Sequence, residues 1–340
     1  MPGWEPDVLP GYWQRTFALG PDPDGEGELV ATLVRRGEPD PRAGHAVLMV
    51  HGFTDYFFNT ELADHFAARG FNFYALDLHK CGRSHREGQT PHFTTDLARY
   101  DRELERSLDV IGAAAPSRIL VYGHSAGGLV VSLWLDRLRA RRATANKGVS
   151  GLVLNSPWLD LQGPAILRTP PTTAALLALR RLRKHSVVRR PAQGGYGATL
   201  HRDYFGEFDY NLQWKPVGGF PVTVGWIHAI RRAQARLHRG LDVGVPNLIL
   251  RSDRSVREVA DPALIQRGDA VLDVAQIARW AGCIGNQTTI VPITDAKHDV
   301  FLSLPEPRQA SYTALDQWLD RYRAETSTPP TQPDRSSRHG

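Results

Sequence analysis

Along most of this chain, a pattern of apolar and polar residues typical of strands alternates with a pattern typical of helices. Between residues 28 and 160, short apolar runs predict strands, and the stretches between them have the spacing of amphipathic helices. This alternation predicts an α/β fold with a mostly parallel central sheet flanked by helices. The apolar run 46–50 fits a strand buried on both faces. The predicted strands lie at 28–36, 45–52, 71–78, 117–123 and 149–157, and the predicted helices at 61–70, 97–114 and 126–142.

The strand–helix alternation stops after Pro157 and resumes near residue 245. The stretch between contains many Gly, Pro, aromatic and basic residues, so we expect an insertion that covers the sheet as a cap. Beyond it, the pattern predicts strands at 247–251 and 288–293 and helices at 272–282 and 308–323. The expected division is a core made of 1–157 and 245–324, a cap at 158–244, and a disordered Pro- and Ser-rich tail at 325–340.

Composition narrows the class of protein. The 340 residues carry a net charge of +5, which is mild for this length and does not point to nucleic acid as a partner. Cys81 and Cys283 show neither metal-binding nor redox spacing, so we expect no metal and no disulfide framework. The first residues lack the pattern of a signal peptide, and no apolar run reaches about 18 residues, so we expect a soluble, cytoplasmic protein.

The sequence Gly-His-Ser-Ala-Gly at 123–127 lies between an apolar strand pattern and an apolar helix pattern. In such a turn the serine takes a strained backbone conformation, and the glycines allow strand and helix to pack closely. The hydroxyl then lies at a helix N-terminus, where the helix dipole favours a developing negative charge. We therefore expect Ser125 to be a nucleophile; the simpler alternative is a helix cap.

A serine hydroxyl needs a base at neutral pH, and the base needs an acid to orient it. His298 follows the predicted strand 288–293 and precedes the last helix, so we expect it to be the base. The acid should follow the strand 247–251. Asp253 does so directly, and Asp269 comes later, just before a helix pattern; the residues by themselves leave both open.

An oxyanion formed by attack on a carbonyl needs N–H donors. One should be the backbone amide of Ala126, directly after the serine. The second should come from the loop that follows the strand pattern at 46–50, and we expect it to be the amide of Phe53. Gly52 would let this loop approach the serine, and His51 would hold the loop by hydrogen bonds.

These positions resemble those of the α/β-hydrolase superfamily, in particular its monoacylglycerol lipase and lysophospholipase-like branch, Hydrolase 4. The resemblance covers about 28–160 and 245–323 and is carried by 47–53, 62–84, 120–128 and 298–302. In that branch, residues 77–84 usually read Asp-x-Arg-Gly-His-Gly-x-Ser, but here His-Lys-Cys replaces Arg-Gly-His. The segment 268–273 is similar to the family's acid loop, which implies that Asp269, rather than Asp253, is the acid.

The resemblance implies a serine hydrolase that cleaves carboxylic esters, such as monoacylglycerols or lysolipids, through an acyl-enzyme on Ser125 and without a cofactor. Two alternatives stay open. The same residues could serve hydrolysis or transfer of another acyl group, or the fold could carry a non-catalytic binding or scaffold protein.

The expected cap carries two further features. Its basic run 178–190 could contact a lipid surface or be only a solvated face. Its apolar residues could line a substrate pocket or form the core of the cap itself. These residues are Trp158, Leu159, Ile166, Leu167, Leu176 and Leu177. The sequence leaves the oligomeric state open.

Overall fold

A computed structural model describes residues 3–114, 118–141, 148–191, 194–257 and 261–327. These residues form a nine-stranded sheet in the order β1-β2-β3-β5-β4-β6-β7-β10-β11. The strands from β5 to β11 in that order are parallel, and the three pairs at the other edge are antiparallel. The strands are β1 (Glu5–Pro6), β2 (Tyr12–Pro21), β3 (Glu28–Arg36), β4 (His45–Val50), β5 (Phe71–Asp77), β6 (Arg118–His124), β7 (Val149–Asn155), β10 (Asn247–Ser252) and β11 (Thr288–Ile293).

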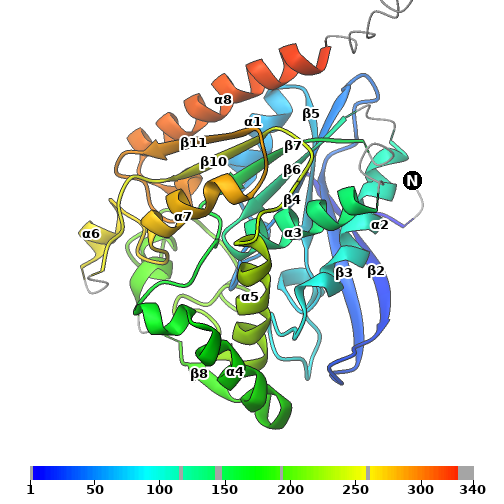
Figure 1. Ribbon diagram of the computed structural model, residues 1–340. Helices are drawn as coiled ribbons and strands as arrows, with labels where there is room; N and C mark the ends of the chain where they lie inside the picture. The colour runs from blue at the N-terminus through cyan, green and yellow to red at the C-terminus, as the bar shows by residue number, and fades with distance from the viewer. Residues whose placement is uncertain (1–2, 115–117, 142–147, 192–193, 258–260, 328–340) are drawn as a thin grey trace, which may run out of the picture.

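Helices cover both faces of this sheet, as the sequence pattern predicts (Figure 1). Val47 and Met49 of β4 pack in a cluster with apolar residues of α1 and α8. Leu48 and Val50 point the other way and pack with residues of α2 and α3. This period of two explains why β4 is an unbroken apolar run. The helices are α1 (Thr60–Ala68), α2 (Asp101–Gly112), α3 (Ala126–Ala140), α4 (Pro170–Arg183), α5 (Val224–Leu237), α6 (Pro262–Ile265), α7 (Val274–Trp280) and α8 (Pro305–Ser327).

The predicted core elements are present, with shifted ends. Helix α7 begins at Val274 rather than at 272, because the Asp273 carboxylate caps it by accepting the N–H of Ala275 at 3.0 Å. Helix α8 extends to Ser327, so residues 325–327 belong to a helix and not to the expected tail, whose remainder, 328–340, lies outside the described residues. Strands β1 and β2 were not predicted.

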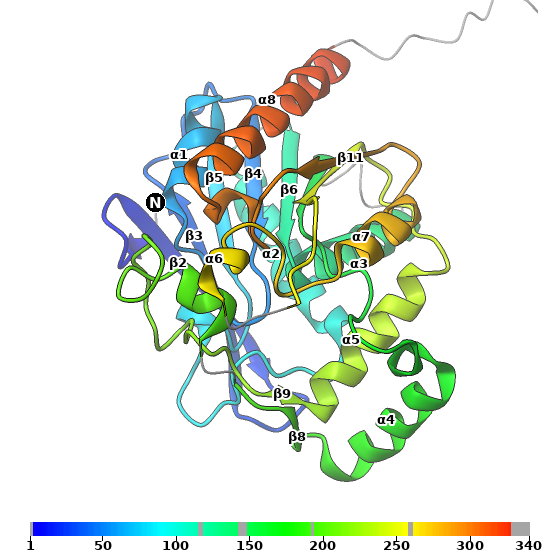
Figure 2. The ribbon, with the colours of Figure 1, turned by 90° about the vertical axis from the view of Figure 1, so that its left-hand side faces the viewer.

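The insertion 158–244 contains regular structure that its sequence did not reveal. It holds α4, α5 and a two-stranded sheet of β8 (Val187–Arg189) and β9 (Val222–Thr223). The buried face of α5, which includes Trp226 and Ile230, packs in the same apolar cluster as α3 of the core. Figure 2 shows α4 and α5 at the end of the molecule opposite α8.

The apolar residues expected to line a pocket in this insertion separate into two groups. Trp158 and Leu159 are buried, Leu176 on α4 is half-buried, and Ile166, Leu167 and Leu177 are exposed. Only the first two therefore belong to an apolar interior.

None of the described helices combines the length and hydropathy needed to cross a membrane.

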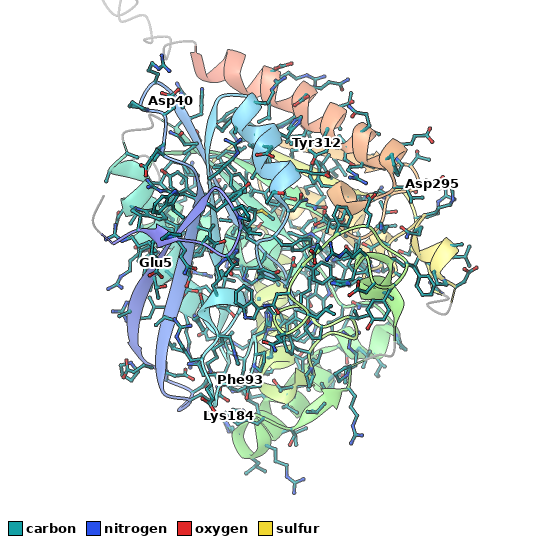
Figure 3. All side chains as sticks on the ribbon, turned by 180° about the vertical axis from the view of Figure 1, so that it is seen from behind. Glu5, Asp40, Phe93, Lys184, Asp295 and Tyr312 are labelled. Atoms are coloured by element: carbon teal, nitrogen blue, oxygen red, sulfur yellow. The ribbon has the colours of Figure 1, made fainter. Side chains whose placement is uncertain are left out.

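Polar contacts fasten the far end of the insertion to the core. Lys184 donates a hydrogen bond from Nζ to the carbonyl oxygen of Asp24 at 2.7 Å, and Figure 3 shows it beside Phe93. The neighbouring His185 ring packs on Phe93 with centroids 4.3 Å apart, and its Nδ1 lies 3.4 Å from a Glu26 oxygen. Part of the basic run 178–190 is thus used inside the molecule.

Candidate active site

Ser125 occupies a sharp turn between β6 and α3. Its φ of 53° and ψ of −120° are unusual for a residue with a side chain, and its N–H donates to the carbonyl oxygen of Asn155 at 3.0 Å. A Cβ at Gly123 would lie 2.8 Å from the Cα of Gly128, and one at Gly127 would lie 2.2 Å from the carbonyl oxygen of His51. Both motif glycines are therefore required by close backbone approach.

His298 is paired with a buried carboxylate. The loop after β11 places its Nδ1 2.9 Å from Oδ2 of Asp269, which is fully buried. The other oxygen of Asp269 accepts the backbone N–H groups of Val271 and Leu272, both at 2.8 Å. This arrangement holds a proton on Nδ1 of His298 and leaves Nε2 as the nitrogen that can accept one.

The two acid candidates have different surroundings. Asp253 pairs with Arg254 at the surface and accepts the N–H of Asp295, so its carboxylate is used away from His298. Asp269 reaches His298 because the chain returns beside the segment that follows β10: the N–H of Val256 donates to the Asp269 carbonyl oxygen, and the Asp269 N–H donates to the carbonyl oxygen of Arg254. The geometry favours Asp269.

Asn155, at the end of β7, joins the serine turn to the histidine loop. Its carbonyl oxygen accepts the N–H of Ser125 and Nδ1–H of His124 at 3.0 and 3.1 Å. Its side chain donates to Asp299 at 2.7 Å and accepts the N–H of Val300 at 3.2 Å. Asn155, whose side chain is fully buried, thus joins the serine turn through its carbonyl oxygen to the histidine loop through its side chain.

The turn that carries Ser125 lies against His298 through the ring of His124. The ring of His124 lies 4.9 Å from that of His298, but within the described residues no hydrogen bond joins the Ser125 hydroxyl to His298. Catalytic hydrogen bonds are often long before substrate binds, and they tighten in the complex. Burial lowers the pKa of His124, so this neighbour stays neutral beside the pair.

The loop after β4 lies against the serine as expected. A Cβ on Gly52 would come within 2.9 Å of the Ser125 Cβ. His51 holds the loop with Nδ1 on the Gly52 carbonyl oxygen at 2.8 Å and Nε2 accepting the N–H of Leu78 at 3.1 Å, which confirms its predicted role. Within the described part of the chain, the amides of Phe53 and Ala126 donate no hydrogen bond, so both remain available to a ligand.

Residues from the insertion complete the surroundings, and sequence reasoning missed them. Tyr196 turns its ring edge to His298, with centroids 5.5 Å apart, and its hydroxyl accepts the N–H of Asp299 at 3.0 Å. Lys215 donates to Asp55 at 2.6 Å. Burial by itself would raise the pKa of Asp55, but the Lys215 ammonium holds it below its usual value. No motif marks these residues, because their roles depend on contacts between distant segments.

One buried cluster has the residue types of a metal site. Ligand atoms of His51, Cys81 and His92 lie within 4.8 Å of one another. Both ring nitrogens of His51 are already engaged with backbone groups, so a metal would have to displace the Leu78 bond. Burial raises the pKa of the Cys81 thiol, so its sulfur stays protonated and is a poor metal ligand; burial lowers the pKa of His92, so its imidazole is neutral. The cluster is therefore built as a hydrogen-bonded group and not as a metal centre.

Comparison with solved structures places the fold. The structure is similar to a soluble variant of monoglyceride lipase from Saccharomyces cerevisiae in complex with a substrate analogue, with a TM-score of 0.62, 16% identity, and coverage of 91% of this chain and 96% of that one. It is also similar to the monoacylglycerol lipase of Paleococcus ferrophilus, with a TM-score of 0.53, 18% identity, and coverage of 92% and 99%. At these identities the likeness shows the α/β-hydrolase fold.

Sequence comparison gives the family. No curated protein matches this chain significantly. The family model of Hydrolase 4, described as serine aminopeptidase, S33, matches residues 41–267, a segment that includes the serine turn. The resemblance noted from the sequence motifs is thereby confirmed, and this chain belongs to the Hydrolase 4 family of α/β hydrolases.

Proposed function

We propose that this protein hydrolyses carboxylic esters through an acyl-enzyme on Ser125. The observation that carries the proposal is the strained serine turn beside a histidine whose Nδ1 is fixed by the buried carboxylate of Asp269. Strain at a turn and a buried His–Asp pair serve no evident packing purpose, and together they make a weak nucleophile reactive.

The proposed reaction has two steps. Nε2 of His298 takes the proton of the Ser125 hydroxyl as its oxygen attacks the ester carbonyl, and the amides of Phe53 and Ala126 bind the resulting oxyanion. The protonated imidazole then gives its proton to the leaving alcohol. Water, deprotonated by His298, attacks the acyl-enzyme, and Ser125 recovers its proton as the carboxylic acid leaves. These steps need no metal or organic cofactor.

We propose monoacylglycerols or lysolipids as the substrate class, with the insertion 158–244 acting as a cap over Ser125. Two structural neighbours are monoglyceride lipases, and the insertion contacts loops on both sides of the serine, through Trp226 on Phe53 and Tyr196 on His298. The core on either side of it would then be 1–157 and 245–324.

The surface of this cap also supports contact with a lipid surface. Its exposed apolar side chains include Leu182, which is 85% exposed, and they lie on or near a helix that carries Arg180, Arg181 and Arg183. Apolar residues beside cations are the composition of segments that lie on anionic membranes. The other exposed apolar side chains of the insertion are Ile166, Leu167, Leu177, Leu179, Val187 and Val188, with Tyr204 and Phe205 further along.

The first experiment is hydrolysis of p-nitrophenyl esters from two to sixteen acyl carbons, with Ser125→Ala as the control. We expect activity that disappears in the variant, and a chain-length optimum that measures the room available under the cap. A serine-directed fluorophosphonate probe separates an enzyme from a scaffold protein. Folded protein that is neither labelled nor active would contradict the proposal and favour the non-catalytic alternative.

A further inference from the structure

A small cavity is lined in part by Phe53 and Ala126, the two residues whose amides we assign to the oxyanion. Its volume is about 20 Å³, which is room for one water-sized group. The loop that carries His298 does not contribute to its described lining. Its lining on the serine side is Gly52, Phe53, Ala126 and Gly127.

The walls of this cavity are mostly apolar and include the cap. Leu97, Val130 and Ile230 contribute aliphatic surface, and Trp226 closes one side by packing on Phe53 with ring centroids 4.0 Å apart. Because Trp226 belongs to α5 of the insertion, the cavity forms only where the insertion packs against the loop after β4. A group held here would meet mostly apolar surface.

One residue that lines the cavity has a buried polar atom without a partner. His92 lines the cavity and is 3% exposed, and its Nδ1 lies 3.2 Å from Sγ of Cys81. Its other ring nitrogen, Nε2, is buried and makes no hydrogen bond with any described residue. Both nitrogens of the neighbouring His51 are engaged, so His92 alone of these two rings offers a free nitrogen. An unpaired buried nitrogen lowers stability unless a bound group completes it.

The position of the cavity indicates which part of an ester would enter it. The leaving alcohol must face His298, which protonates it, and that loop is absent from the described lining. A group in the cavity must also lie within a few bonds of the carbonyl carbon, since the carbonyl oxygen would sit at the amides of Phe53 and Ala126. The acyl part, near its second or third carbon, meets both conditions.

We propose that this cavity binds a hydroxyl group on carbon 2 or 3 of the acyl chain, with Nε2 of His92 as its hydrogen-bond partner. The preferred substrates are then hydroxyacyl esters, a refinement that rests on the ester hydrolysis proposed above. A neutral imidazole nitrogen and a hydroxyl suit each other because the hydroxyl can donate or accept. A plain acyl chain leaves Nε2 unpaired, so it should bind less well in the transition state.

The test compares methyl octanoate with methyl 2-hydroxyoctanoate and methyl 3-hydroxyoctanoate in a pH-stat assay. In each protein, kcat/KM for a hydroxy ester is divided by kcat/KM for octanoate. For one of the two hydroxy esters we expect this ratio to be about tenfold or more higher in the natural protein than in His92→Phe. Dividing the two ratios cancels the intrinsic reactivity of each ester. His92→Asn should restore part of the preference, because asparagine tolerates the φ of 60° at this position and keeps an amide.

His85→Phe is the matched control, since His85 bonds to the Gln89 carbonyl oxygen outside the cavity, and it should keep the natural ratio. Thermal unfolding of each variant establishes that it is folded. Equal ratios in the natural protein and His92→Phe would overturn the inference and leave the cavity to a structural water. If no ester is cleaved and the fluorophosphonate probe does not label Ser125, the proposed ester hydrolysis itself fails and this refinement falls with it. Cleavage of octanoate without a hydroxyl preference overturns the refinement alone.

Discussion

The loops that hold Ser125, Asp269 and His298 differ from the insertion 158–244 in what fixes them. The loops are held by buried hydrogen bonds to backbone groups, as at Asn155, at the carboxyl end of β7, and at Asp269 within its own loop. The insertion buries one face of α5, but it leaves much of α4 exposed and is fastened by side-chain contacts such as Lys184 on Asp24.

This difference separates the loops that would carry out the chemical step from the segment that would control the entry of substrate. Buried, satisfied hydrogen bonds hold groups to the tolerance that proton transfer needs. Segments with few buried contacts open at a lower free-energy cost than the core, and such segments commonly admit substrate. We therefore expect variants in the loops to change the chemical step, and variants in the insertion to change binding, pH response or surface contact.

The largest expected effect is at the acid. Asp269→Asn should lower kcat by about a thousandfold or more, because the amide cannot hold the same proton on Nδ1 or stabilise the imidazolium. The matched variant Asp253→Asn should stay within about threefold of the natural protein, since its carboxylate bonds to Arg254. Steady-state kinetics on one p-nitrophenyl ester decides, and the reverse order would assign the acid role to Asp253.

The second effect concerns a contact between loop and insertion. Nζ of Lys297 donates to the carbonyl oxygen of Thr199 at 2.9 Å, and burial lowers the pKa of Lys297 to about 8. Between pH 8 and the unfolded value near 10.5, the unfolded chain binds more protons, so stability rises with pH, by up to about 3 kcal/mol for this group. In urea unfolding from pH 7 to 10, the free energy of unfolding of the natural protein should rise relative to that of Lys297→Met. Parallel curves would mean that Lys297 titrates normally.

The third effect tests the bridge between the two loops. Asn155→Ala removes the bonds to Asp299 and Val300 and should cost about 2 kcal/mol of stability, together with roughly a tenfold loss of kcat. Asn59→Ala is the control, because Asn59 is similarly buried but caps α1 through the N–H of Leu62. It should lower the unfolding midpoint with kcat intact. An equal loss of kcat in both variants would mean that Asn155 affects activity only through the general stability of the protein.

The smallest effect lies at the exposed surface of the insertion. Leu182→Glu should weaken co-sedimentation with anionic phospholipid vesicles a few-fold, because it removes an exposed apolar side chain and adds a repelled charge. Val8→Glu is the control, because Val8 is an apolar residue that lies outside the insertion and is 67% exposed. This variant should sediment as the natural protein does. Activity on a soluble ester should not change in either variant. Equal binding by all three proteins would contradict the lipid-surface proposal.

Local pattern was enough for several features of this protein. The apolar run of β4 and the strand–turn–helix around Ser125 could both be predicted from residues close in the chain. The reason is physical: a strand buried on both faces must be apolar throughout, and a turn without room for a Cβ must have glycine. Helices α4 and α5 were missed: α5 buries one face against α3 of the core, whereas α4 packs mainly on α5 and leaves most of its own surface exposed, so it lacks a strong apolar stripe.

Only the tertiary structure decided which distant groups meet. The residues left Asp253 and Asp269 both open until the resemblance favoured Asp269. The fold separates them, because the chain returns beside the segment after β10 and brings only Asp269 to His298. The same holds for Asn155, Tyr196 and the unpaired nitrogen of His92. Short-range pattern records what each element must bury, whereas hydrogen bonds between loops depend on where strand ends and an insertion come together in space.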